Sequence, residues 1–309
     1  MNSVLIVGSI GLDNLKTPKG IKENVLGGSI SHASLAAKIF TNVNIIGIIG
    51  EDFPQEYLQL FQSKGINTEG LKIHQGKTFR WSGEYKGDMN EAITLDTQLN
   101  TFASFNPELD QKQRETDYVL LGNIQPDLQL NILSQLSEPK FVMCDTMNLW
   151  INTMPDKLKE VIKQTNLLLV NDKEAKMLSE CDNLISAAEK ILQMGPEYLI
   201  IKKGEHGSML FSNQGEIFIL PAYPLSCVID PTGAGDSFAG GLLGNLAQES
   251  KINFETIKRS MISGTIIASY TTQDFGPEML QTVTADDLIK RSEEFLQIIQ
   301  TPSTQRVLV

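Results

Sequence analysis

A glycine-rich turn, Asp230–Phe238, carries residues whose types and spacing could bind an anion. Pro231 has no backbone N–H and ends the preceding apolar run, so the chain must turn there. Gly233 and Gly235 let the backbone come close to a ligand. Apolar residues then recur with the helical period from Phe238 onward, so a helix is expected to start at this turn. Free amides at the positive end of a helix form an anion site.

Asp236 lies inside that predicted anion site. A carboxylate there repels an anion unless it has chemical work, such as accepting the proton of a hydroxyl that attacks phosphorus. The alternative is that Asp236 caps the helix and the glycines only turn the chain. The residues of this turn, taken alone, leave both interpretations open.

Composition limits the classes of partner and of compartment. The chain has 309 residues, a net charge of −11 and three histidines, which disfavours a nucleic-acid partner or an anionic membrane surface. Cys144, Cys181 and Cys227 are odd in number and far apart, as expected of reduced thiols in a cytoplasmic protein. We find neither a basic leader nor an apolar run long enough to cross a membrane.

Strands and helices alternate along most of the chain. Ser3–Val7 and Val43–Ile49 read as buried strands, and the alternation resumes at Tyr118. This pattern predicts an α/β fold with a mostly parallel sheet and helices on both faces. Several polar or glycine residues directly follow predicted strands and should therefore share one ligand-binding rim. They are Asp13, Asp145, Asn171, Glu174 and Gly204.

The segment from Leu71 to Phe105 differs from the rest. Its runs alternate in polarity and are separated by glycine turns, which favours a small meander of half-exposed strands. A sheet with one open face suggests a lid over a pocket or a dimer surface. Trp81 or Phe79 could stack on a sugar or base ring there, or could belong to the core of the lid.

Two further motifs have both a structural and a functional interpretation. Gly27-Gly28-Ser29 opens a helix that Ser29 could cap, and His32 in its first turn is either a capping or surface residue or part of the site. Asn171 and Glu174 have the spacing of a capping box, but beside an anion site Glu174 could also hold Mg²⁺ through water.

Taken together, these motifs resemble the PfkB, or ribokinase-like, carbohydrate kinase family. Asp230–Phe238 is similar to the C-terminal signature of that family. The other matching pieces follow in the family's order across nearly the whole chain: Gly8-Ser9 with Asp13, Gly27-Gly28, the β lid, Asn171-x-x-Glu174 and Lys203-Gly204.

The resemblance implies an ATP-dependent phosphotransferase. It implies a single domain over residues 1–309, with a ribokinase-like, Rossmann-type three-layer core and a small β lid inserted at about 12–27 and 71–105. Asp236 would be the base, and the amides of Gly233, Ala234 and Gly235 would hold the transferring phosphoryl group.

The resemblance also implies where the ligands bind. The acceptor would contact Asp13, Gly27, Gly28 and His32. Asn171, Lys203, Gly204 and Gly207 would bind the nucleotide, and Glu174 would organise Mg²⁺. A monovalent cation such as K⁺ near Asp230 and a homodimer formed through the lid are left open.

Three departures from the family pattern bear mainly on the acceptor. His32 stands where asparagine is usual, Pro231 stands where threonine is commoner, and no arginine follows Asp145-Thr146-Met147-Asn148. No Walker sequence is present, which excludes a P-loop enzyme as far as a pattern can. We expect a kinase that phosphorylates a hydroxymethyl hydroxyl of a small sugar. The alternatives are a nucleoside kinase of the same family and a sugar-binding homologue without turnover.

Overall fold

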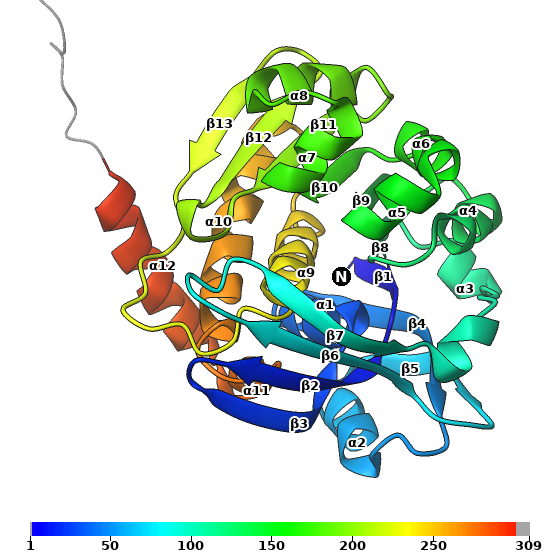
Figure 1. The fold of residues 1–309 in the computed structure, drawn as a ribbon. Helices are drawn as coiled ribbons and strands as arrows, with labels where there is room; N and C mark the ends of the chain where they lie inside the picture. The colour runs from blue at the N-terminus through cyan, green and yellow to red at the C-terminus, as the bar shows by residue number, and fades with distance from the viewer. Residues whose placement is uncertain (1, 301–309) are drawn as a thin grey trace, which may run out of the picture.

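A nine-stranded sheet forms the centre of the protein in the computed structural model, which describes residues 2–300 (Figure 1). The strand order is β13-β12-β11-β10-β9-β8-β1-β4-β5, and all neighbours are parallel except for the two antiparallel pairs formed by β11, β12 and β13. The bounds are β1 Ser3–Val7, β4 Asn42–Gly50, β5 Asn67–His74, β8 Tyr118–Leu121, β9 Phe141–Asp145, β10 Leu167–Asn171, β11 Tyr198–Lys202, β12 Ser208–Ser212 and β13 Ile217–Leu220.

Helices cover both faces of this sheet and make two apolar cores (Figure 1). One core packs the sheet against α1, α9 and α10, and the other packs it against α4, α6 and α8. The predicted three-layer α/β core is therefore confirmed. The helices are α1 Ser29–Lys38, α2 Gln55–Ser63, α3 Gln111–Arg114, α4 Pro126–Gln135, α5 Asn148–Thr153, α6 Pro155–Lys163, α7 Asp172–Ser179, α8 Leu184–Leu192, α9 Ala234–Leu246, α10 Phe254–Thr271, α11 Glu278–Thr282 and α12 Ala285–Ile299, with short 3₁₀ helices η1 Asn100–Ser104 and η2 Gly204–His206.

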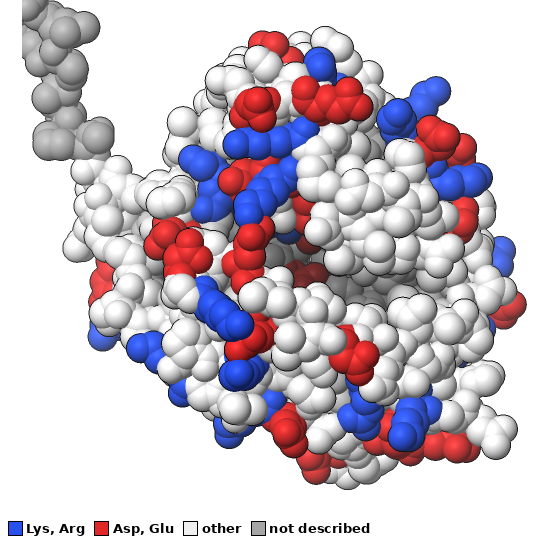
Figure 2. Space-filling view, in the orientation of Figure 1, with Lys and Arg blue, Asp and Glu red and all other residues white. Residues whose placement is uncertain are grey.

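A second, four-stranded sheet has the order β3-β2-β6-β7 and lies beside the main body (Figure 1). Its strands are β2 Gly11–Thr17, β3 Gly20–Gly27, β6 Phe79–Tyr85 and β7 Ala92–Gln98. We call it the small sheet. Figure 2 shows a hollow between it and the main body, with acidic side chains inside.

The start predicted for the second inserted segment, residue 71, is wrong. Residues 71–74 belong to β5, which pairs in parallel with β4 at the edge of the main sheet. β5 is mostly exposed or half-buried because it is an edge strand, so its pattern resembles that of the strands that follow. The small sheet resumes only at Phe79.

α1 and α9 pack so closely that their backbones nearly touch. A Cβ built on Gly240 of α9 would lie only 2.1 Å from the carbonyl oxygen of Ala33 in α1.

The N-terminus of α1 does not use the predicted serine cap. Gly28 occupies the cap position with φ of 87°, and Ser29 Oγ instead accepts the N–H of Ser9 at 3.1 Å.

No helix within residues 2–300 is both long and apolar enough to span a bilayer.

Candidate active site

The turn before α9 has the geometry of an anion site. Gly233 caps the helix with φ of 73°, a left-handed conformation that favours glycine. The Ala234 amide donates to the carbonyl oxygen of Pro231 at 3.2 Å. The amides of Gly233 and Gly235 donate to no other residue within the described chain. Two of the three amides in the predicted hole are therefore free to bind a ligand.

Asp230 fixes the shape of this turn. Its buried carboxylate accepts the N–H of Thr232 at 2.9 Å and the N–H of Gly276 at 3.0 Å. Burial raises the pKa of Asp230, although these hydrogen bonds oppose the rise. The side chain thus joins the start of α9 to the loop after α10.

Asp236 lies in the first turn of α9 and does not cap the helix, because no side chain within residues 2–300 makes a cap hydrogen bond there. The helix-cap interpretation is therefore wrong. Burial, and next the negative charge of Asp145, raise the pKa of Asp236 to about 7, while Lys202 opposes the rise. A carboxyl group with a pKa near neutrality is suited to accept a proton from a hydroxyl.

Asp13, in β2, faces the same centre. Its side chain is buried, and its pKa is raised to about 8 by burial and then by the charges of Asp230 and Asp236. A Cβ on Gly27 would lie 2.1 Å from Asp13 Oδ2, so the neighbouring strand must have glycine there. Asp13 Oδ1 is buried without a hydrogen-bond partner among the described residues.

His32 is buried in the first turn of α1, so the capping and surface interpretations are wrong. Its ring lies over the α9 turn, since a Cβ on Gly233 would come within 2.3 Å of three ring atoms. Burial lowers the pKa of His32 to about 4, which leaves the imidazole neutral at pH 7. Neither ring nitrogen has a hydrogen-bond partner in the described part of the chain.

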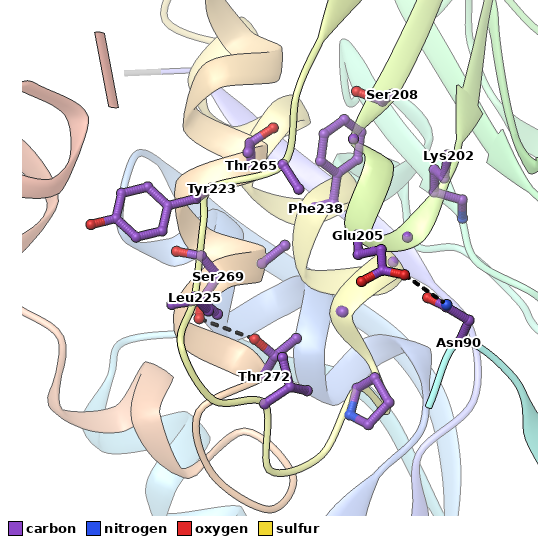
Figure 3. Close-up of a pocket in the computed structure, with 18 of the residues that line it drawn as sticks. Asn90, Lys202, Glu205, Ser208, Tyr223, Leu225, Phe238, Thr265, Ser269 and Thr272 are labelled. Carbon is purple, nitrogen blue, oxygen red and sulfur yellow. Dashed lines mark hydrogen bonds between the residues drawn. The ribbon is translucent and has the colours of Figure 1, made fainter. Parts of the chain in front are cut away.

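A cavity of about 530 Å³ lies on the other side of the α9 turn (Figure 3). Its walls come from the β11–β12 loop, α9, α10 and the β6–β7 loop. Gly204 and Gly207 line it, as does Gly235. The cavity therefore adjoins the anion site directly.

Lys203 does not line this cavity, whereas Lys202 does. The backbone N–H of Lys203 donates to the carbonyl oxygen of Gly207 at 2.7 Å and closes the loop. Lys202 forms an ion pair with Asp145 at 2.9 Å. The sequence analysis did not identify Lys202 as a site residue. The signal was present, because Lys202 ends an apolar strand at the ligand-binding rim.

Asn171 and Glu174 form the capping box that their spacing suggested. Asn171 Oδ1 accepts the Glu174 N–H at 2.8 Å, and Glu174 Oε2 accepts the Asn171 N–H at 2.7 Å. Burial raises the pKa of Glu174 to about 7, with Lys202 opposing. Oε1 accepts no hydrogen bond from the described residues, so it could still accept one from a metal-bound water. Within residues 2–300 no three His, Cys, Asp or Glu side chains cluster as metal ligands.

The small sheet contacts both the α9 turn and the β11–β12 loop of the cavity. The Thr232 hydroxyl donates to the Tyr85 hydroxyl oxygen at 3.2 Å, and Asn90 in the β6–β7 loop donates to Glu205 at 3.3 Å (Figure 3). Trp81 pairs with Asp13 across β6 and β2, which places the two side chains on one face of the sheet. Sequence reasoning did not identify Tyr85 or Asn90, whose contacts depend on how the two sheets meet.

Comparison with known proteins identifies the same family that the sequence motifs resemble. Residues 3–282 match the model of the pfkB family carbohydrate kinases. The chain is 27% identical over 249 residues to a cytidine kinase of Thermococcus kodakarensis, covering 79% of this chain and 88% of that protein.

Two solved structures share the fold. The nucleoside kinase of Methanocaldococcus jannaschii superposes with a TM-score of 0.76 at 22% identity, over 95% of this chain and 99% of that one. A putative ribokinase II from E. coli in complex with ATP and Mg²⁺ has a TM-score of 0.78 at 17% identity, over 96% and 100% of the two chains. Since the family model spans nearly the whole chain, this protein belongs to the pfkB family of carbohydrate kinases.

Proposed function

We propose that this kinase moves the γ-phosphoryl group of ATP onto a hydroxymethyl hydroxyl of a small sugar. The observation that carries the proposal is Asp236, a carboxyl with a pKa near 7, beside the free amides of Gly233 and Gly235. Asp236 accepts the hydroxyl proton while the hydroxyl oxygen forms its bond to the γ-phosphorus. The bond from that phosphorus to the bridging oxygen breaks, and ADP leaves.

The acceptor and the nucleotide approach the α9 turn from opposite sides. Asp13 and His32 offer the acceptor polar atoms that have no partner among the described residues. Gly27 and Gly28 shape this side of the site, since a Cβ on Gly27 would meet the Asp13 carboxylate and one on Gly28 would meet the carbonyl oxygen of Ser9. Gly204 and Gly207 shape the nucleotide cavity, and the backbone bond of Lys203 holds their loop.

Mg²⁺ would be held at Glu174 through water, with Asn171 fixing that carboxylate. The ion supplies positive charge that offsets the charge of the phosphates. A K⁺ dependence near Asp230 is a further proposal, which an activity assay in Na⁺, K⁺ and choline buffers would test.

Replacing Asp236 tests the assignment of the base. Asp236→Asn should lower kcat by at least about 10²–10⁴-fold, because general-base assistance is lost. Binding of ADP, measured by calorimetry, should change little. The exposed Asp156→Asn is the matched control and should keep full turnover. An Asp236→Asn enzyme as fast as the wild type would remove Asp236 from the reaction.

A nucleoside acceptor is the second candidate. It is favoured by Trp81, a half-buried indole beside Asp13 that could stack on a base. The similarity to proteins named cytidine kinase and nucleoside kinase points the same way.

A panel of free sugars and nucleosides, assayed for ADP release with ATP and Mg²⁺, separates the two candidates. Turnover of nucleosides alone would defeat the sugar proposal. Calorimetric binding of a sugar with no ADP formed from any acceptor would instead indicate a binding protein without turnover.

Two proposals concern the protein's surroundings. We propose a cytoplasmic location, supported by the use of ATP and by three free cysteines. We also propose a homodimer through the small sheet, because its edge strand β7 is exposed along its whole length.

A further inference from the structure

We infer that Lys202 binds the phosphoryl group during its transfer and that Asp145 is the positioning residue that holds Lys202 at the α9 turn. This inference rests on the phosphotransfer proposed above. It adds to the site a charged side chain that the free amides alone do not supply.

The position of Lys202 is the first observation. Lys202 is the last residue of β11, so its side chain leaves the sheet at the edge that faces α9. A Cβ built on Gly235 would lie 3.2 Å from Lys202 Nζ, which places the ammonium group directly beside a free amide of the anion site. The described residues that line the 530 Å³ cavity include one lysine, Lys202, and no arginine (Figure 3).

The second observation is how Lys202 is held. Its Nζ donates to both carboxylate oxygens of Asp145, at 2.9 and 3.1 Å. Asp145 is itself fixed, because Oδ1 accepts the Thr146 N–H at 3.0 Å and the backbone carbonyl accepts from Gln129 at 3.1 Å. A lysine held in this way needs little reordering when a ligand arrives.

The third observation is the charge around the Lys202–Asp145 ion pair. A buried ion pair contributes little net stability, since the cost of removing both charges from water offsets their attraction. Burial alone would lower the pKa of Lys202. The negative charges of Asp145 and then Glu174 more than offset this effect and raise the pKa above its ordinary value, so the side chain remains cationic. Around it lie the carboxylates of Asp145, Glu174 and Asp236. A polyphosphate entering this acidic site requires such a cation.

The test uses Lys202→Met, which removes the charge and keeps most of the side-chain volume. We expect kcat/KM for ATP to fall on the order of 10²-fold, as when one preorganised donor is lost from an oxyanion site. The loss of affinity should be greater for a non-hydrolysable ATP analogue than for ADP, because Lys202 lies at the anion site. The exposed Lys176→Met of α7 is the matched control and should behave as wild type.

The pH profile gives a readout that a purely structural lysine would not move. The titratable groups that act on Asp236 are Asp145 of β9, Lys202 of β11, Asp13 of β2 and Tyr85 of β6. The neutral imidazole of His32 in α1 lies over Gly233 in the same turn. Lys202 lowers the pKa of Asp236. Its removal should therefore shift the acid limb of the kcat/KM profile to higher pH.

Asp145→Asn and the double variant test the positioning role. If Asp145 acts through Lys202, Asp145→Asn should cost less than Lys202→Met, and the double variant should be no worse than Lys202→Met alone. Independent, additive losses would overturn the positioning role.

Unchanged kcat/KM and an unmoved acid limb in Lys202→Met would overturn the phosphate-binding role. These outcomes are separable from failure of the proposed function, which would appear in Asp236→Asn. Circular dichroism and thermal unfolding of each variant show whether it is folded.

Discussion

Four carboxyl groups at the site, those of Asp13, Glu174, Asp230 and Asp236, have raised pKa values, and burial is the first cause for each. The pKa is about 8 for Asp13 and about 7 for Asp236 and Glu174. Folding therefore favours their protonated forms. The stability that this contributes is fully present below the unfolded pKa of about 4 and is lost as pH rises through the folded values. These residues favour function at the expense of stability near neutral pH.

Asp13→Asn should accordingly stabilise the ligand-free protein at alkaline pH. The wild type should lose stability between about pH 4 and pH 8, and the variant should lose less, since an amide does not ionise. Each kcal/mol gained raises Tm on the order of 2 °C in a chain of this size. Thermal unfolding at pH 5 and pH 8.5 measures the difference, with exposed Asp156→Asn as the control.

The same variant should lose activity, because Asp13 is proposed to hold the acceptor. A wild-type stability that does not change over this pH range, or an Asp13→Asn protein with a lower Tm at pH 8.5, would contradict the assignment of a buried carboxyl that is protonated in the folded state.

At the residue scale the sequence located the site but left some roles undecided. The glycine spacing predicted the turn, yet only the structure shows that Asp236 makes no cap bond and that His32 is buried. Lys202 and Lys203 are adjacent, and the sequence favoured Lys203. Which of two neighbouring side chains faces a cavity depends on the direction of the strand end and on partners such as Asp145, which are distant in sequence.

At the element scale, close packing of α1 and α9 sets the geometry of the site. α9 carries the anion turn and α1 carries His32, so any change in their separation moves one against the other. Glycines permit the approach, since a Cβ on Gly240 would lie 2.1 Å from Ala33 O and one on Gly244 would lie 2.8 Å from Ala37 O. Backbone atoms cannot move aside as the end of a side chain can.

Gly240→Ala should therefore both destabilise the protein and impair catalysis. Overpacking of this kind costs about 1–3 kcal/mol, and the displaced helix would separate the α9 turn from His32. Urea unfolding and kcat measure the two effects. Gly241→Ala is the graded comparison, because its Cβ would meet the side chain of Ile267 at 3.1 Å, which can adjust. Equal stability of the two variants would contradict this account.

The sequence predicts the order of strands and helices along the chain more readily than it predicts which of the two sheets a strand joins. Alternating strands and helices predicted the main sheet and its two helical layers. The sequence places residues 71–74 of β5 in the small sheet, because an edge strand of the main sheet has the same half-exposed pattern. Long-range pairing with β4 decides its place, and that pairing leaves no local signal in the residues of β5.

At the scale of the whole molecule, the small sheet joins the two halves of the site. Tyr85 reaches the α9 turn through Thr232, and Asn90 reaches the nucleotide loop through Glu205. One of the two edge strands of the small sheet, β7, pairs with β6 and is exposed throughout. Exposed edge strands with apolar side chains tend to pair with another chain. On β7 and just after it, Ile93, Leu95 and Leu99 are 47%, 58% and 50% exposed.

We therefore expect the wild type to sediment as a dimer at micromolar concentration and the Ile93→Lys/Leu95→Lys variant to sediment as a monomer. Lysine on an edge strand opposes pairing by placing like charges at the interface. Ile217→Lys, at an exposed position on the edge strand β13 of the main sheet, is the matched control and should stay dimeric. A wild type that is monomeric at every concentration would exclude the dimer. Loss of the dimer in the β13 variant instead would move the interface to the other sheet.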